Sequence, residues 1–157
     1  MPTYKHLRRL DSVRLAAPVY FITICVQNRR PILANEAVVS IFRDEFEAAP
    51  TRYGWRVGRF VAMPDHLHFF CVSDETPASA SLSQFIARFK QWTAKRILAR
   101  ASPHALLWQK QFFDHLLRSN ESYDSKWLYV RDNPVRAGFV ATADEWPYGG
   151  EITAIFR

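Results

Sequence analysis

M-P-D-H-L-H-F-F-C-V, residues 63–72, is an apolar run in which two histidines stand one residue apart. Its aromatic and apolar residues predict a strand over residues 66–73. Successive side chains of a strand point to opposite faces, so His66 and His68 share one face, about 7 Å apart along the strand. The opposite face holds Leu67, Phe69 and Cys71. The two imidazoles can provide two ligands to one metal ion. Phe70 lies on the same face and makes it partly apolar.

Further strands are predicted on both sides of this run. Residues 19–27 (V-Y-F-I-T-I-C-V-Q) are rich in β-branched and aromatic residues, and residues 53–62 and 108–117 are also predicted strands. Only residues 63–65 separate the strand over 53–62 from the histidine strand. A link this short favours an antiparallel hairpin, in which the histidines lie at the beginning of the second strand.

Helices are predicted between these strands. The first covers residues 35–48, begins at the N-cap residue Asn35 and has Pro50 beyond its end. A second covers residues 81–100. A third begins at residue 119 or 120 and ends at residue 133, because the proline that follows disfavours helical geometry there. The chain therefore alternates strands with helices.

The helix predicted over residues 81–100 carries only positive charges. Its cations are Arg88, Lys90, Lys95, Arg96 and Arg100, and no acidic residue of the helix balances them. A solvated helix face usually mixes both signs, so we expect this surface to face phosphates rather than only to aid solubility. Trp92 lies among these residues and fits a core position better than a base-stacking one.

Length, composition and charge narrow the class of protein. The 157 residues fit one domain, with residues 1–18 as a basic N-terminal arm and residues 149–157 as a short tail. A hydrophobic content of 48% excludes a mostly disordered chain. A net charge of +6 favours a nucleic-acid partner over a membrane surface, since no amphipathic anchor accompanies it.

The cysteines and the hydropathy predict the compartment. Cys25 and Cys71 lie in apolar strand-like runs without C-x-x-C spacing, which is typical of buried cysteines in a reducing compartment. No apolar run reaches the roughly 18 residues of a membrane span, and no apolar segment follows the charged start of the chain. We therefore expect a cytoplasmic protein without a membrane partner.

Tyr129 and Asn133 are four residues apart in the third predicted helix. Residues at this spacing share a helix face, which places a phenolic hydroxyl beside an amide oxygen that can ligate a hard cation. A tyrosine with a free pKa of about 10 is a poor nucleophile, so a cation is needed to neutralise the phosphate that it attacks. Together with the two histidines, the pair predicts a metal-assisted nucleophile that attacks phosphodiesters, although either motif alone is more often structural.

Several longer stretches occur together in the chain: Y-F-I-T (20–23), M-P-D-H-L-H (63–68), F-K-Q-W-T-A-K-R (89–96), W-Q-K-Q-F-F-D-H-L-L-R (108–118), Y-V-R-D-N-P-V-R-A-G (129–138) and W-P-Y (146–148). In them the chain resembles the REP-associated tyrosine transposases, a branch of the IS200-like single-tyrosine HUH transposases. The resemblance implies a ferredoxin-like α/β sandwich with a central antiparallel sheet and helices packed on it. It also implies metal ligation by His66, His68 and Asn133, with Tyr129 as nucleophile. The residues implied to lie near the site or the DNA are Asp114, His115 and Arg118.

The resemblance further implies an enzyme that cuts single-stranded DNA at repetitive extragenic palindromic (REP) hairpins with a short 5′ guide sequence. Cleavage leaves a 5′-phosphotyrosine and a free 3′-hydroxyl, requires a divalent metal such as Mg²⁺ or Mn²⁺, and is reversed by strand transfer. A monomer is favoured, although mobile-element relatives pair. The chain departs from the family at Gly149 and Gly150, where members tend to carry serines. Two alternatives stay open: a catalytically silent hairpin-binding protein of the same fold, and a small phosphoesterase in which Tyr129 stacks on the substrate.

Overall fold

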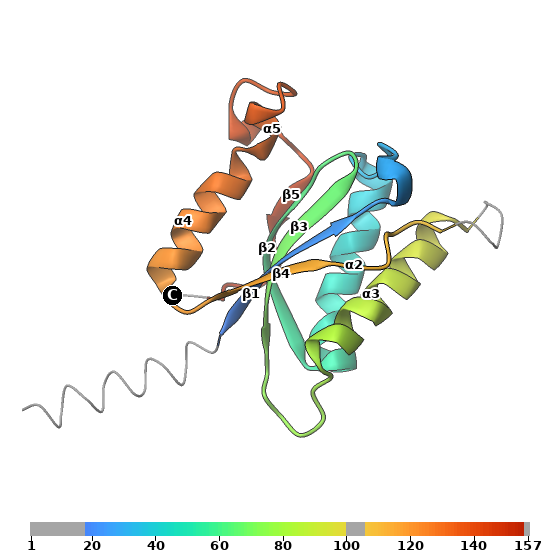
Figure 1. The fold of residues 1–157 in the computed structure, drawn as a ribbon, viewed down its shortest axis with the longest axis vertical. Helices are drawn as coiled ribbons and strands as arrows, with labels where there is room; N and C mark the ends of the chain where they lie inside the picture. The colour runs from blue at the N-terminus through green and yellow to red at the C-terminus, as the bar shows by residue number, and fades with distance from the viewer. Residues whose placement is uncertain (1–17, 100–105, 156–157) are drawn as a thin grey trace, which may run out of the picture.

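The computed structural model describes residues 18–99 and 106–155, which form a central antiparallel sheet with helices on both faces (Figure 1). The strands of these residues pair in the order β4-β1-β3-β2-β5, and every neighbouring pair is antiparallel. The strands are β1 (Val19–Cys25), β2 (Trp55–Ala62), β3 (His66–Ser73), β4 (Phe113–Leu117) and β5 (Gly149–Glu151). The helices are α2 (Glu36–Tyr53), α3 (Leu82–Ile97), α4 (Asn120–Arg131) and α5 (Asn133–Arg136), with 3₁₀ turns η1 (Gln27–Arg29) and η2 (Ala143–Glu145). The predicted α/β fold class with a central antiparallel sheet is confirmed.

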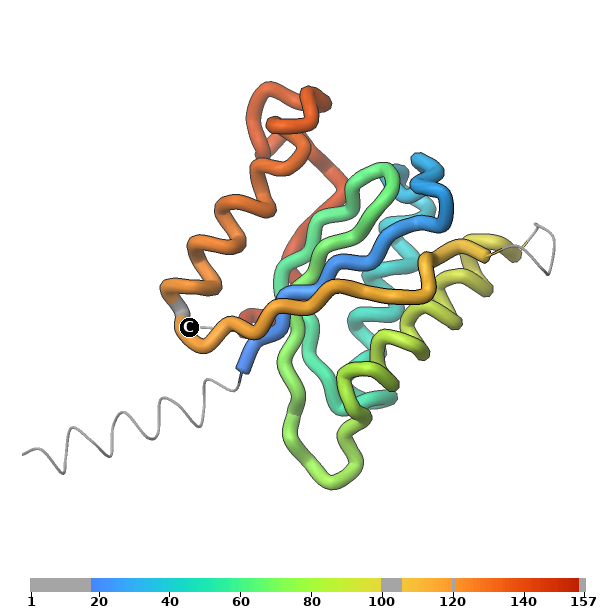
Figure 2. The backbone as a smooth tube through the Cα atoms, in the orientation of Figure 1, coloured from blue at the N-terminus to red at the C-terminus, as the bar shows by residue number. Residues whose placement is uncertain are grey.

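β3, the histidine strand, lies in the middle of the sheet between β1 and β2. The predicted hairpin between β2 and β3 is confirmed, and the Met63 N–H donates to the carbonyl of His66 across it at 2.8 Å. On the other side, Thr23 of β1 stands opposite His68. β4 lies beside β1 although the two are far apart in the sequence (Figure 2). The histidines therefore stand on a strand that is hydrogen-bonded along both edges.

The main hydrophobic core lies between the sheet and helices α2 and α3, which cover one face (Figure 1). Leu67, Phe69 and Cys71 of β3 all contribute to this core, as the alternation of the strand predicts. Phe46 of α2 stacks on Phe89 of α3 at a centroid distance of 4.9 Å, which joins the two helices. The fully buried phenylalanines of this core are Phe42, Phe46, Phe60, Phe69, Phe85 and Phe89.

The opposite face of the sheet is covered by α4 and holds two smaller apolar clusters. One consists of Val19, Phe70, Leu117 and Tyr123. The other consists of Val61, Met63 and Val130. Phe70 belongs to β3 and shares the face of His66 and His68, so these histidines lie on the α4 face, away from the main core.

α2 is longer than predicted. Asn35 caps it as expected, its side chain accepting from the Val38 N–H at 3.0 Å, but the helix continues past Pro50 to Tyr53. Proline removes one hydrogen bond in the last turns, and the packing of the buried face of the helix outweighs that loss. The helix ends at Gly54, whose φ of 73° lies in the left-handed region and whose N–H donates to the carbonyl of Pro50.

α3 begins at its predicted cap, Ser81, but ends at Ile97 rather than at residue 100. Arg100 lies outside the described residues. The expectation that Trp92 belongs to the core is wrong, because its side chain is exposed and the Lys95 ammonium lies 5.1 Å from its ring centroid. None of the helices in residues 18–99 and 106–155 combines the length and the hydropathy needed to cross a membrane.

β4 and β5 also differ from the predicted elements. β4 begins at Phe113 and not at residue 108, because Trp108 is buried in the main core and its indole N–H donates to the Thr93 hydroxyl of α3 at 3.0 Å. Part of the predicted tail forms β5, which pairs with β2. A Cβ atom on Gly149 would lie 2.7 Å from the Phe60 carbonyl oxygen, so the absence of a side chain permits this close pairing.

Candidate metal and nucleophile site

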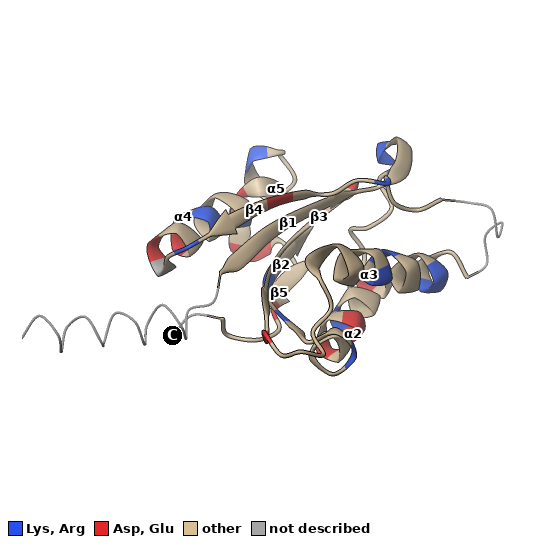
Figure 3. Cartoon of the chain, turned by 60° about the horizontal axis from the view of Figure 1, so that its bottom comes forward, with Lys and Arg blue, Asp and Glu red and all other residues tan. Residues whose placement is uncertain are grey.

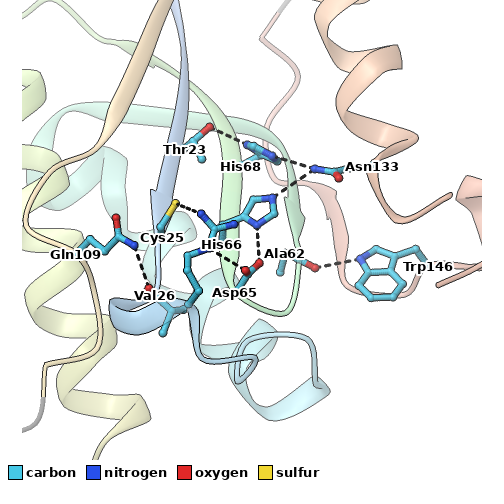
Figure 4. A network of polar contacts seen from close by, with 11 residues as sticks. Thr23, Cys25, Val26, Ala62, Asp65, His66, His68, Gln109, Asn133 and Trp146 are labelled. Atoms are coloured by element: carbon cyan, nitrogen blue, oxygen red, sulfur yellow. Dashed lines mark hydrogen bonds and ion pairs between the residues drawn. The ribbon is translucent and has the colours of Figure 1, made fainter. Parts of the chain in front are cut away.

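His66 and His68 lie next to each other on the α4 face of β3 (Figure 4). Their ring centroids are 4.7 Å apart and their planes are inclined by 78°. The Nδ2 atom of Asn133 lies 3.4 Å from Nε2 of His66 and 3.1 Å from Nε2 of His68. Polar side-chain atoms from the central strand and from α5 therefore converge within hydrogen-bonding distance of one another.

The other ring nitrogen of each histidine is held by an oxygen atom (Figure 4). Nδ1 of His66 lies 2.8 Å from Oδ1 of Asp65, and Nδ1 of His68 lies 2.8 Å from the hydroxyl oxygen of Thr23. Arg29 donates from Nε to the second oxygen of Asp65 at 2.8 Å. With the Nδ1 hydrogens donated to these oxygens, both Nε2 atoms keep a lone pair for a cation.

The protonation states of these groups suit metal binding. Burial is the main cause that lowers the pKa of His68 to about 3, and the charges of His66, Lys126 and Arg136 act in the same direction. His68 is therefore neutral at pH 7, the form in which imidazole ligates metal ions. Burial opposes ionisation of Asp65, but the hydrogen bonds that this carboxylate accepts outweigh it and lower its pKa below the usual value.

The donor atoms fit a divalent cation. Across the described part of the chain, no cluster of three or more His, Cys, Asp or Glu side chains is placed to share a metal ion, so the third protein ligand would be the amide of Asn133. Rotation of the amide group exchanges its two ends and brings Oδ1 to the place of Nδ2. Two imidazole nitrogens and one amide oxygen suit an ion that accepts mixed ligands and keeps open positions for a substrate.

Tyr129 and Asn133 do not lie on one helix, and in this the prediction from their spacing is wrong. α4 ends at Arg131, and Asn133 is the first residue of α5. Pro134 explains the break, because its ring disfavours helical continuation through the preceding residue and fits the first turn of a new helix. The break places Asn133 against the histidines, while Tyr129 remains on the surface of α4.

Tyr129 is accessible to a substrate. Its side chain is 63% exposed. The Arg136 guanidinium lies 3.8 Å from the centroid of its ring. Tyr129 also borders a pocket of about 680 Å³ between β4 and α4. The lining residues of this pocket are His115, Leu117, Ser119, Glu121, Ser122, Ser125, Lys126 and Tyr129.

The predicted residues of β4 divide between the two faces of the sheet. His115 stands opposite Phe21 and lines the same pocket as Tyr129. Asp114 stands opposite Ile22, a residue of the main core, so the alternation of the strand directs Asp114 to the face away from the histidines. Arg118 is exposed just beyond the end of the strand.

The basic helix α3 lies on the opposite side of the sheet from α4 (Figure 3), and therefore on the face away from the histidines. Nζ of Lys90 donates to three successive backbone carbonyls, those of residues 109–111, at 2.8, 3.2 and 3.0 Å. Arg96 forms ion pairs with two acidic residues of α2 at 2.9 and 3.2 Å. Arg88 and Lys95 are exposed. The charges of Lys90 and Arg96 thus already have intramolecular partners, and the structure does not bring this helix to the histidine face.

The site contains residues that are not among the predicted ones. Thr23 and Asp65 orient the histidine rings, and Lys126 and Arg136 supply charge near Tyr129. Asp65 has a signal in the sequence, because it stands directly before the H-x-H pair. Thr23 has none of its own, since its contact depends on how β1 pairs with β3.

Known proteins share this sequence pattern and fold. The profile of the family described as "Transposase IS200 like" matches residues 17–131. A Haemophilus influenzae protein provisionally named a REP-associated tyrosine transposase is 25% identical over 140 residues, which cover 83% of this chain and 77% of the relative. The REP-associated tyrosine transposase of Escherichia coli K12 is 24% identical over 136 residues, with coverages of 82% and 73%. A solved REP-associated tyrosine transposase bound to a REP hairpin matches with a TM-score of 0.70 at 22% identity, covering 85% of this chain and 76% of that one.

Proposed function

Because the chain belongs to the IS200-like transposase family, we propose that it cuts and rejoins single-stranded DNA at REP-type hairpins through a covalent phosphotyrosine. The observation that supports this most directly is the convergence of His66 and His68 on the Asn133 amide. These groups lie on the sheet face that α4 covers, and α4 carries the exposed Tyr129 beside its pocket. A potential nucleophile and a potential metal site therefore occupy the same face.

In this proposal, His66, His68 and Asn133 hold a divalent ion such as Mg²⁺ or Mn²⁺. The bound ion supplies positive charge for the phosphate and its leaving oxygen. Asp65 and Thr23 fix the orientation and tautomer of the two histidine rings through their Nδ1 atoms. β3 is the central strand of the sheet and is hydrogen-bonded on both sides, so neighbouring strands support the backbone that carries the two imidazoles.

Tyr129 acts as the nucleophile of the proposed reaction. Its Oη forms a bond to the scissile phosphorus while the bond from phosphorus to the 3′-oxygen breaks. The phenol gives up one proton and the departing 3′-oxygen gains one, so the exchange balances without an oxidant or a cosubstrate. Strand transfer is the reverse exchange, in which a 3′-hydroxyl attacks the phosphotyrosine and releases the phenol.

The hairpin partner is proposed from the charge of this chain and from its relatives. A structural relative was solved with a REP hairpin. The net charge of +6 favours association with a polyanion. We propose that residues 1–157 act as one domain and as a monomer, because β3, α4 and α5 of a single chain carry the proposed ligands and the nucleophile. DNA contacts by the exposed residues His115, Arg118, Arg88 and Lys95 belong to the same proposal.

A 3′-end-labelled single-stranded REP hairpin with its 5′ guide tests this function in the presence of Mn²⁺. The wild-type protein should form a labelled adduct that survives denaturation, because the 3′ fragment stays on the tyrosine. Tyr129→Phe should form no adduct while its hairpin affinity stays within a few fold of wild type. Tyr148→Phe is the matched control, since this tyrosine packs against Trp146, and it should form the adduct.

The same assay separates the alternative functions. Hairpin binding by the wild-type protein without any adduct would support a catalytically silent binding protein. Hydrolysis of a small nucleotide diester without an adduct would support a phosphoesterase in which Tyr129 contacts the substrate by stacking. An adduct that persists in Tyr129→Phe would show that another residue is the nucleophile.

A further inference from the structure

Lys126 is a cation in the same pocket as Tyr129. It lies three residues before Tyr129 on α4, so the two side chains are neighbours on the helix surface and both line the pocket. Glu121 lines this pocket as well, but Lys126 forms no ion pair with any acidic side chain of residues 18–99 and 106–155. The ammonium group therefore keeps its charge available for an anion in the pocket.

Lys126 also lies close to the proposed metal ligands. Its Nζ is 5.0 Å from the centroid of the Phe21 ring, and Phe21 stacks on His68 at a centroid distance of 5.2 Å with an interplanar angle of 26°. One aromatic ring thus separates the ammonium group from a histidine of the pair.

We propose that Lys126 is a catalytic residue that binds the scissile phosphate and neutralises one of its non-bridging oxygens while Tyr129 attacks. This inference rests on the proposed function. A phosphate that Tyr129 attacks next to His68 must approach both side chains, and Lys126 borders both the Tyr129 pocket and the Phe21 ring that stacks on His68. The non-bridging oxygens of the phosphate carry negative charge throughout the exchange. An ammonium group with three N–H donors stabilises this charge.

The structure offers a matched control for the aromatic contact of Lys126. Lys95 on α3 lies 5.1 Å from the ring centroid of Trp92, nearly the same geometry as Lys126 over Phe21. However, Lys95 lies across the sheet from the histidines and does not line the Tyr129 pocket. A purely structural role of the cation–π contact predicts similar effects of removing either lysine, whereas a catalytic role predicts different ones.

The test compares Lys126→Met, Lys126→Arg and Lys95→Met on two hairpin substrates. One carries the natural phosphodiester at the cleaved position, and the other carries a methylphosphonate, which lacks the anionic oxygen. On the phosphodiester at saturating hairpin concentration, Lys126→Met should slow adduct formation by roughly 100-fold and Lys126→Arg should recover much of the rate. Lys95→Met should lower hairpin affinity, because Lys95 is a proposed phosphate contact, and should slow adduct formation far less than Lys126→Met does. On the methylphosphonate, the difference between wild type and Lys126→Met should largely disappear.

Two results would contradict a catalytic role of Lys126. An undiminished rate in Lys126→Met, or the same loss on both substrates, would overturn the inference. If the methylphosphonate is not cut at all, hairpin affinities in a Tyr129→Phe background replace the rates, and Lys126→Met must remove the preference for the charged linkage. Failure of the proposed function is distinguishable, because then the wild-type protein itself forms no adduct at Tyr129. Circular dichroism melting of each variant identifies a loss caused by unfolding.

Discussion

Oδ1 of Asp65 lies 2.8 Å from Nδ1 of His66, and this contact turns Nε2 of His66 toward the Asn133 amide. A carboxylate in this position fixes the ring and increases the basicity of Nε2, the nitrogen that would ligate an ion in the proposed site. The contact of two residues adjacent in sequence thus prepares the imidazole for a cation before any cation binds.

Asp65→Asn should raise the Mn²⁺ concentration for half-maximal cleavage by about 10-fold, because the amide is a weaker acceptor for the His66 N–H. The maximal rate should change little. The control is Asp74→Asn, since Asp74 also pairs with an arginine, Arg56, but lies away from the histidines. Nicking rates measured across a Mn²⁺ titration decide the matter, and an unchanged half-maximal concentration in Asp65→Asn would leave the contact without a role in metal affinity.

Asn133→Ala should raise the metal concentration for half-maximal cleavage by roughly 10- to 100-fold, the usual effect of disturbing a metal shell. Asn133→Gln should restore part of the activity because it keeps an amide oxygen. The same Mn²⁺ titration reports both effects. A lower maximal rate with a normal metal dependence would instead indicate that Asn133 positions the DNA or Tyr129.

The salt dependence of hairpin binding should separate the exposed cations of α3 from the paired ones. Replacing Arg88 and Lys95 by glutamine should flatten the log–log dependence of affinity on salt by one to two units, because two phosphate contacts release fewer counterions. Lys90→Gln should leave the slope unchanged and lower thermal stability, because three carbonyl groups lose their donor. An unchanged slope in the double variant would place the DNA surface on the α4 face instead.

The metal-free protein should lose stability as the pH falls below about 6.5. The pKa of His68 is lowered from 6.5 to about 3, so between these values the unfolded chain binds more protons than the folded one. The free energy of unfolding therefore decreases with falling pH, by up to about 1.4 kcal/mol per pH unit from this group. Urea unfolding in EDTA at pH 7, 6 and 5 measures the slope. His68→Gln should flatten it, and an equally steep slope in that variant would assign the effect to other groups.

Strand pattern and link length were sufficient to predict β3 and its hairpin. The bounds of β3 match the prediction because a short link and an alternating run leave little freedom in register. The end of α2 was not predictable from Pro50, since tertiary packing of the helix face overcame a local breaker. Trp108 shows the same limit, because its contact with Thr93 depends on the packing of α3.

The candidate site was predictable to a similar degree. The H-x-H spacing alone places both imidazoles on one face, whereas the angle between α4 and α5 that brings Asn133 to them depends on the break before Pro134. The charge balance of the basic helix is not contained in its own sequence: the helix has no acidic residue, yet α2 supplies Asp44 and Glu45 as partners of Arg96. Charge balance between elements is a tertiary property, and a linear pattern does not contain it.

The orientation of the two histidines depends on the main hydrophobic core on the other face of β3. Leu67, Phe69 and Cys71 anchor the strand in the main core, and this anchoring alone decides that both imidazoles face α4. Inserting or deleting a single residue in the strand would turn the imidazoles into the apolar layer and the apolar side chains outward. A change in the length of this strand would therefore disrupt the main core and the candidate site together.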